Sequence, residues 1–126
     1  MLSVLAVAAL AMAAQDPGQW QDFGAGRDGV RVSVNLDSIE TGTQGPEAMV
    51  RLRYPRPVAR NVTQADVRGV FECSSRRVRR FLMNELTSTG EIMARSDEGE
   101  PMEAVTAAAG TPMGEVLDLV CATATG

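Results

Sequence analysis

The residues that could do chemistry in this chain are unusually few. All twelve of its basic residues are arginine, and it has neither lysine nor histidine. Histidine is the commonest general base and metal ligand. Without it, the serines at Ser74, Ser75 and Ser88 have no usual activating partner. The acidic residues could supply a carboxylate pair for glycoside hydrolysis, but no pattern positions one. We therefore expect a protein that is not an enzyme and has no cofactor.

The two cysteines, Cys73 and Cys121, are the remaining reactive groups. Neither lies in a CxxC motif, and no histidine is present to activate a thiolate. In an oxidising compartment two such cysteines are expected to pair, whereas in a reducing one they would be two unrelated buried thiols. We favour the disulfide. Closing this loop would stabilise the fold by about 4 kcal/mol in the chain-entropy model.

The N-terminal segment supports export and therefore the disulfide. Residues 2–10 are almost wholly apolar, and Ala11-Met12-Ala13 has the A-x-A form of a signal-peptidase site. The segment has no lysine or arginine before it, and it is too short for a stable membrane span. We predict a signal peptide over residues 1–13 and one domain over residues 14–126. No cysteine follows the apolar segment to carry a lipid, so the predicted location is the periplasm or cell surface.

The charges are distributed unevenly along the chain. Residues 51–80 contain nine arginines against two acids, and residues 81–126 contain one arginine against eight acids. One interpretation is that neighbouring strands pair these charges on the surface. The other is a basic face for an anionic partner, with the candidate binding patch at Arg76, Arg77, Arg79 and Arg80. The net charge of −4 argues against nucleic acid as a partner.

The acidic residues suggest no metal site. Asp97, Glu98, Glu100 and Glu103 do not have the spacing of an EF-hand loop, and a solvated turn is the favoured interpretation. Asp37 follows a predicted strand, and we expect it to bind backbone amide groups there.

Alternation of apolar and polar residues predicts strands over residues 30–36 and 48–54, joined as a hairpin. Pro55 and Pro57 are expected to end the second strand, with an irregular connection over residues 56–64. A third strand is predicted over residues 66–73.

The C-terminal half contains one ambiguous segment. Residues 76–86 fit either a helical stripe or an alternating strand, with a slight lean to helix. Short strands are predicted over residues 91–95 and 102–105. Thr111-Pro112 is typical of a helix start, and the helix that follows carries Cys121. Gly114 weakens that helix, so packing and the disulfide must support it.

The order of these segments resembles the surface-adhesin protein E family of small proteobacterial envelope proteins. The resemblance depends on Leu36-Asp37-Ser38-Ile39, Tyr54-Pro55, Phe71-Glu72-Cys73-Ser74-Ser75-Arg76-Arg77, Gly90 and Leu119-Val120-Cys121. It covers roughly residues 20–121. It implies an α+β fold: one bent antiparallel sheet of about five to six strands, with a C-terminal helix joined to it by the disulfide. On that basis residues 76–86 are assigned to a strand.

The resemblance also implies a protein partner, either a host matrix protein such as vitronectin or laminin or another envelope protein. Two features depart from the family. Members often have tryptophan where this chain has Met49 or Val50 and Met102, and the best-known member has a lipid-anchoring cysteine. No binding residues are carried over, because the matching segments define the fold. The alternative is a structural or accessory periplasmic protein with no adhesin role.

Overall fold

The computed structural model describes residues 18–95 and 101–125. Within them the chain forms eight strands, two short 3-10 turns and one helix. The predicted signal peptide lies outside the described residues, as do Asp97, Glu98 and Glu100. The elements are β1 (Trp20–Ala25), β2 (Arg31–Asn35), η1 (Leu36–Ser38), β3 (Glu40–Gly42), β4 (Gly45–Val58), η2 (Ala59–Asn61), β5 (Val62–Glu72), β6 (Arg77–Thr87), β7 (Ile92–Arg95), β8 (Met102–Thr106) and α2 (Pro112–Thr125).

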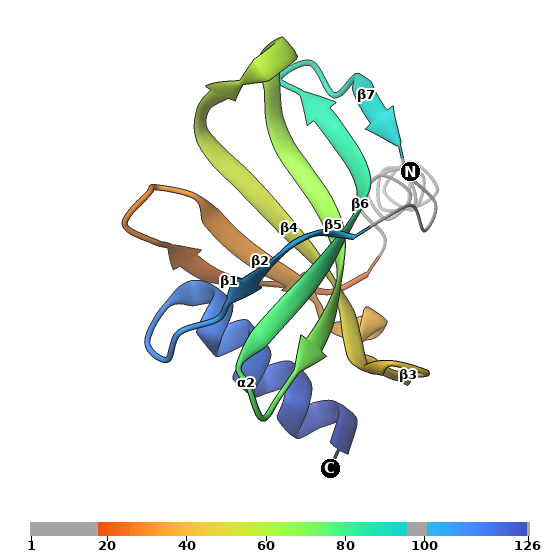
Figure 1. Cartoon of the computed structure of the whole chain (residues 1–126). Helices are drawn as coiled ribbons and strands as arrows, with labels where there is room; N and C mark the ends of the chain where they lie inside the picture. The colour runs from red at the N-terminus through yellow and green to blue at the C-terminus, as the bar shows by residue number, and fades with distance from the viewer. Residues whose placement is uncertain (1–17, 96–100, 126) are drawn as a thin grey trace, which may run out of the picture.

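The strands form one antiparallel sheet with the order β1-β2-β4-β5-β6-β7. Strand β3 pairs with the start of β4, and β8 pairs with β6 at the end opposite β7. The sheet is strongly bent, and α2 crosses one end of it (Figure 1). This confirms the antiparallel sheet and the C-terminal helix, but the prediction of five to six strands was wrong. The two unrecognised strands, β1 and β3, have no strong alternating pattern, because Trp20 and Phe23 of β1 are three positions apart and β3 is only three residues long.

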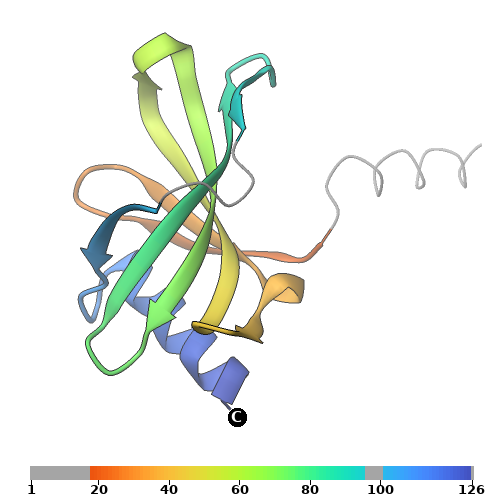
Figure 2. The same ribbon diagram turned by 45° about the vertical axis from the view of Figure 1, so that its right-hand side comes forward.

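Strand β4 continues through both prolines, contrary to the prediction that they end it. Its pairing with β2 stops at Arg53, and its pairing with β5 is irregular from Arg53 to Val58. Proline lacks an N–H but adopts extended backbone, so Pro55 and Pro57 fit where the ladder is already broken. The predicted irregular connection is instead the end of a β4–β5 hairpin closed by η2. Figure 2 shows this hairpin extending away from α2.

The ambiguous segment is a strand, as assigned. Strand β6 pairs with β5 over nearly its whole length, with Phe71 opposite Val78 and Arg68 opposite Phe81. Its alternating side chains therefore lie on opposite faces of the sheet. Val78 faces the helix-covered core, whereas Phe81 lies on the outer face.

The hydrophobic core lies between the sheet and α2. The helix contributes Val116, Leu117 and Val120, each at most 2% exposed. Full burial of a side chain of this size stabilises the fold by roughly 1.5–3 kcal/mol. From the sheet and the segment before the helix, the buried core contains Val32, Val34, Ala48, Val50, Leu52, Val67, Phe71, Val78 and Ala107.

The start of α2 agrees with the predicted cap. The Gly114 N–H donates to Thr111 Oγ1 at 3.1 Å, which satisfies one of the free amides of the first turn. Gly114 is buried, and a Cβ there would collide with the Ala108 carbonyl oxygen. The glycine that weakens helix propensity is therefore needed for the close approach of the segment before the helix.

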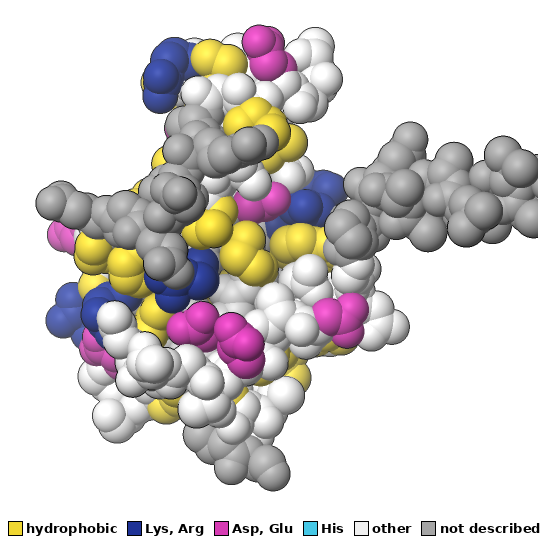
Figure 3. All heavy atoms as spheres, turned by 90° about the vertical axis from the view of Figure 1, so that its right-hand side faces the viewer, with side chains coloured by type: hydrophobic (Ala, Val, Ile, Leu, Met, Phe, Trp, Pro, Cys, Tyr) yellow, Lys and Arg dark blue, Asp and Glu magenta, His cyan; other side chains and the backbone are white. Residues whose placement is uncertain are grey.

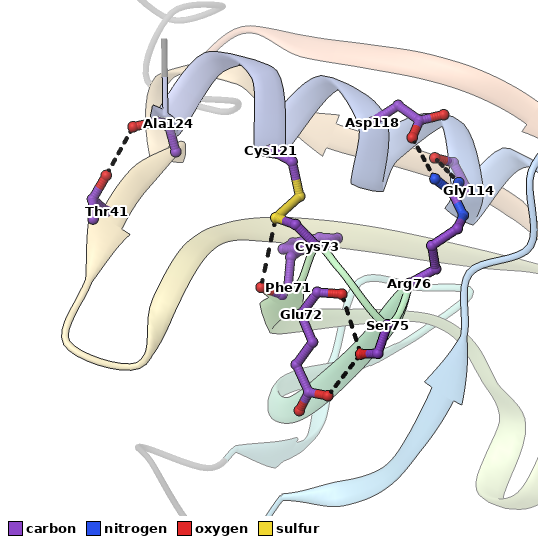
Figure 4. Close-up of a disulfide and its surroundings, with 10 residues drawn as sticks. All are labelled: Thr41, Phe71, Glu72, Cys73, Ser75, Arg76, Gly114, Asp118, Cys121 and Ala124. Carbon is purple, nitrogen blue, oxygen red and sulfur yellow. Dashed lines mark hydrogen bonds and ion pairs between the residues drawn. A yellow bond between two sulfur atoms is a disulfide. The ribbon is translucent and has the colours of Figure 1, made fainter.

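Cys73 and Cys121 form the predicted disulfide, with their Cα atoms 6.1 Å apart and a separation of 48 positions in sequence. Cys73 follows β5 and Cys121 lies in α2, so the bridge fixes the helix to the sheet (Figure 4). A second link joins the end of the helix to β3, because the Thr41 hydroxyl donates to the Ala124 carbonyl at 3.0 Å. Among the described residues, no helix has the length and apolar character needed to cross a membrane.

Candidate functional site

The four arginines of the candidate binding patch do not form one patch. Arg76 lies in the turn between β5 and β6, where its φ of 54° is left-handed. Its guanidinium donates to the Ala107 carbonyl at 3.1 Å and the Gly114 carbonyl at 3.3 Å, and it pairs with Asp118 at 2.7 Å (Figure 4). Arg76 therefore clamps the helix and the segment before it to the turn.

Arg77 and Arg79 lie on the outer face of the sheet. Arg79 forms an ion pair with Glu72 at 3.2 Å. Arg77 is opposite Glu72 in the β5–β6 register and is exposed. Arg80 has the opposite orientation, because its neighbours along β6 alternate between faces. The patch thus divides into a structural clamp, an outer pair and one arginine on the helix side of the sheet.

Arg80 lines a cleft of about 580 Å³. The cleft is open on one side and lies between the β1–β2 turn, the middle of β4 and β6, the end of β8 and the first turn of α2. Such a volume is in the range of small-ligand sites. Its lining residues are Gly26, Arg27, Asp28, Val30, Val32, Leu52, Tyr54, Arg80, Thr106, Thr111, Pro112 and Met113.

Two turns shape the cleft. At the β1–β2 turn, the Val30 N–H donates to Asp28 Oδ1 at 3.0 Å, and Gly29 has a left-handed φ of 79°. At the other side, the Thr111 cap positions Pro112 and Met113 at the start of α2. Of the two, the helix start at Thr111-Pro112 was predicted from the sequence. Their meeting depends on the sheet topology, which no local pattern encodes.

Arg80, Tyr54 and Thr106 supply hydrogen-bond donors to the cleft. Burial raises the pKa of Tyr54 above its ordinary value of 10.0, and Glu85 raises it further, while Arg80 opposes the change. Its phenol therefore stays protonated at neutral pH. Neither the Tyr54 nor the Thr106 hydroxyl has a hydrogen-bond partner among the described residues. Sequence reasoning missed Tyr54 as a site residue, and its only signal was that it is the one tyrosine of the chain.

The outer face of the sheet carries paired charges over apolar side chains. Arg51 pairs with Asp66 at 3.0 Å, and Arg68 pairs with Glu47 at 3.4 Å and lies 4.4 Å from the centre of the Phe81 ring. Figure 3 shows apolar side chains between arginine and acidic ones on one face. These contacts agree with the first interpretation of the charge pattern, in which neighbouring strands pair opposite charges.

The remaining sequence candidates have structural places. Asp37 accepts a hydrogen bond from the N–H of Gln19, just before β1, at 3.2 Å, and not from an amide near it in sequence as predicted. The local cap after β2 is Asn35, whose Oδ1 accepts from the Asp37 N–H at 3.0 Å. Glu103 is exposed on β8. Within residues 18–95 and 101–125, no three cysteine or carboxylate side chains are grouped so that they could hold a metal ion.

Comparison with known proteins adds no relative. No family model, no curated protein and no solved structure matches the chain.

Proposed function

We propose that this chain is an exported binding module of the bacterial envelope, without enzymatic activity, and that the cleft is where it holds its partner. The observation that carries the proposal is the convergence of Arg80, Tyr54 and Thr106 on an apolar floor. A concave, mainly apolar site with a few oriented polar groups is the usual form of a ligand site. These three residues offer two hydroxyl groups and a cation, and they do not form a nucleophile paired with a base.

Export is supported by the disulfide, which persists in oxidising compartments, and by the apolar N-terminal segment. The resemblance to surface-adhesin protein E adds protein partners, from the host matrix or from the envelope itself, to the candidates. The alternative role as a structural or accessory periplasmic protein predicts contacts spread over the surface and not centred on the cleft.

Site-specific photocrosslinking in cells separates these roles. A benzophenone amino acid at Arg27, which is exposed at the rim of the cleft, should give a crosslinked product in the envelope fraction. The matched control is the same substitution at Glu115, which is exposed on α2 and does not line the cleft. Adducts of equal yield from both positions, or none from Arg27, would contradict the cleft as the binding site.

A further inference from the structure

Arg80 differs from the other partly buried arginines of the sheet. Arg51, Arg68 and Arg79 each have a carboxylate partner. Arg80 is also partly buried, but its guanidinium makes only one long hydrogen bond to the described residues, from Nη2 to the Glu103 carbonyl at 3.4 Å. Its Nε atom is buried without a hydrogen-bond partner, as are those of Arg68 and Arg79. What sets Arg80 apart is that it forms no ion pair within the described part of the chain. A partly buried cation is normally neutralised, and Arg80 is left without a carboxylate partner.

The other groups of the cleft indicate the chemistry of a ligand that would bring an anionic group to Arg80. The floor consists of Val30, Val32, Leu52, Pro112 and Met113, which favour an apolar body. The hydroxyl groups of Tyr54 and Thr106 are available as donors beside Arg80. A carboxylate can accept from a guanidinium and a hydroxyl at once.

An acyl chain fits this floor better than a peptide does. Each residue of a peptide brings an N–H and a C=O group, and an apolar floor leaves such groups without partners at a cost. An acyl chain brings none. The rim charges of Arg27 and Asp28 offset each other, so Arg80 supplies the net charge of the cleft.

We infer that the cleft binds a medium-chain fatty acid, with its carboxylate on Arg80 and its acyl chain over Val30, Leu52 and Met113. This inference rests on the proposed function only in taking the cleft as the binding site. The carboxylate accepts from the terminal Nη groups of Arg80, and Tyr54, which stays protonated, donates the second bond.

Calorimetric titration of the purified, oxidised protein with hexanoate, octanoate and decanoate tests the assignment. Affinity should rise by about fourfold for each added methylene group until the cleft is full. Decanoate should bind at least tenfold more tightly than the neutral decanol, because a hydrogen bond to a charged group is among the stronger ones. Equal affinity for decanoate and decanol would overturn the role of Arg80, and this comparison needs no variant.

Variants then locate the carboxylate. Arg80→Gln should weaken decanoate binding at least tenfold while leaving decanol unchanged, and Tyr54→Phe should weaken it several-fold. Arg77→Gln is the matched control, because Arg77 lies on the opposite face of the same strand, and it should change neither. Circular dichroism of each variant establishes that it is folded.

The outcomes separate the two proposals. If decanoate does not bind but a benzophenone at Arg27 captures a protein, the fatty-acid assignment is wrong and the binding module stands. If decanoate does not bind and Arg27 captures nothing, both are wrong. Binding of decanoate that Arg80→Gln leaves unchanged would also overturn the assignment.

Discussion

The strongest prediction about stability concerns Arg76, which holds the helix and the segment before it to the β5–β6 turn. Replacing Arg76 with alanine removes the hydrogen bonds to the Ala107 and Gly114 carbonyls, each contributing about 1 kcal/mol. It also removes the ion pair with Asp118, whose side chain is 57% exposed, so that pair contributes only about 0.5 kcal/mol. We expect Arg76→Ala to lower the free energy of unfolding by about 2.5 kcal/mol in total.

The left-handed backbone at this position predicts a difference in stability between the alanine and glycine variants. A non-glycine residue at φ 54° is strained by roughly 1–2 kcal/mol, and glycine is not. Arg76→Gly should therefore be more stable than Arg76→Ala by about 1 kcal/mol, although both lack the guanidinium. Arg76→Lys should be the most stable of the three variants, because its ammonium group keeps part of the contact. It should still be less stable than the wild type, because lysine lacks the forked geometry of arginine.

Urea unfolding followed by circular dichroism measures these differences in the free energy of unfolding, provided that its slope against urea concentration is the same for each variant. The alanine variant should also melt roughly 10 °C lower, since about 1 kcal/mol shifts the melting temperature of a domain of this size by 4 °C or more. Arg77→Ala is the control, because its exposed side chain should change stability by no more than about 0.5 kcal/mol. The clamp is refuted if Arg76→Ala costs no more than Arg77→Ala, or no more than Asp118→Asn.

Three further results are expected. Reduction of the disulfide should lower the melting temperature by at least several degrees, from a loss of up to about 4 kcal/mol; no change would mean that the bridge does not restrain the unfolded chain. Gly114→Ala should destabilise the protein in urea unfolding, since its Cβ meets the Ala108 carbonyl, although alanine normally favours a helix by about 1 kcal/mol. Absorbance titration of Tyr54 should give a pKa above the value of 10.0 in unfolded protein, and Arg80→Gln should raise this pKa further. The free energy of unfolding should fall as the pH rises from 10.0 through the pKa of the folded protein. A native pKa at or below 10.0 would contradict the burial of the phenol.

Local patterns predicted the elements that have strong signals. The alternation around Val32 and Val34 and the Thr111-Pro112 cap led to β2 and α2, because each depends on neighbours within one turn or one strand. Residues 76–86 show the limit of that approach. Their spacing suits a helix as well as a strand, and pairing with β5 decides between them.

The candidate site was harder to predict for a related reason. The arginines at Arg76, Arg79 and Arg80 are close in sequence, but a left-handed turn and strand alternation direct them to three different places. The partners of Arg76 lie on α2 and just before it, 31–42 residues away. Such separations follow from tertiary packing, which a charge pattern does not contain.

The position of the disulfide has a consequence for the order of folding. Cys73 follows the second strand of the β4–β5 hairpin, whereas Cys121 belongs to the last element of the chain. The two sulfur atoms can meet stably only after that hairpin has formed and the helix has docked on it. Contacts this distant in sequence form late, because closing a long loop is entropically costly. The native disulfide would therefore form only in a domain that has already completed its fold.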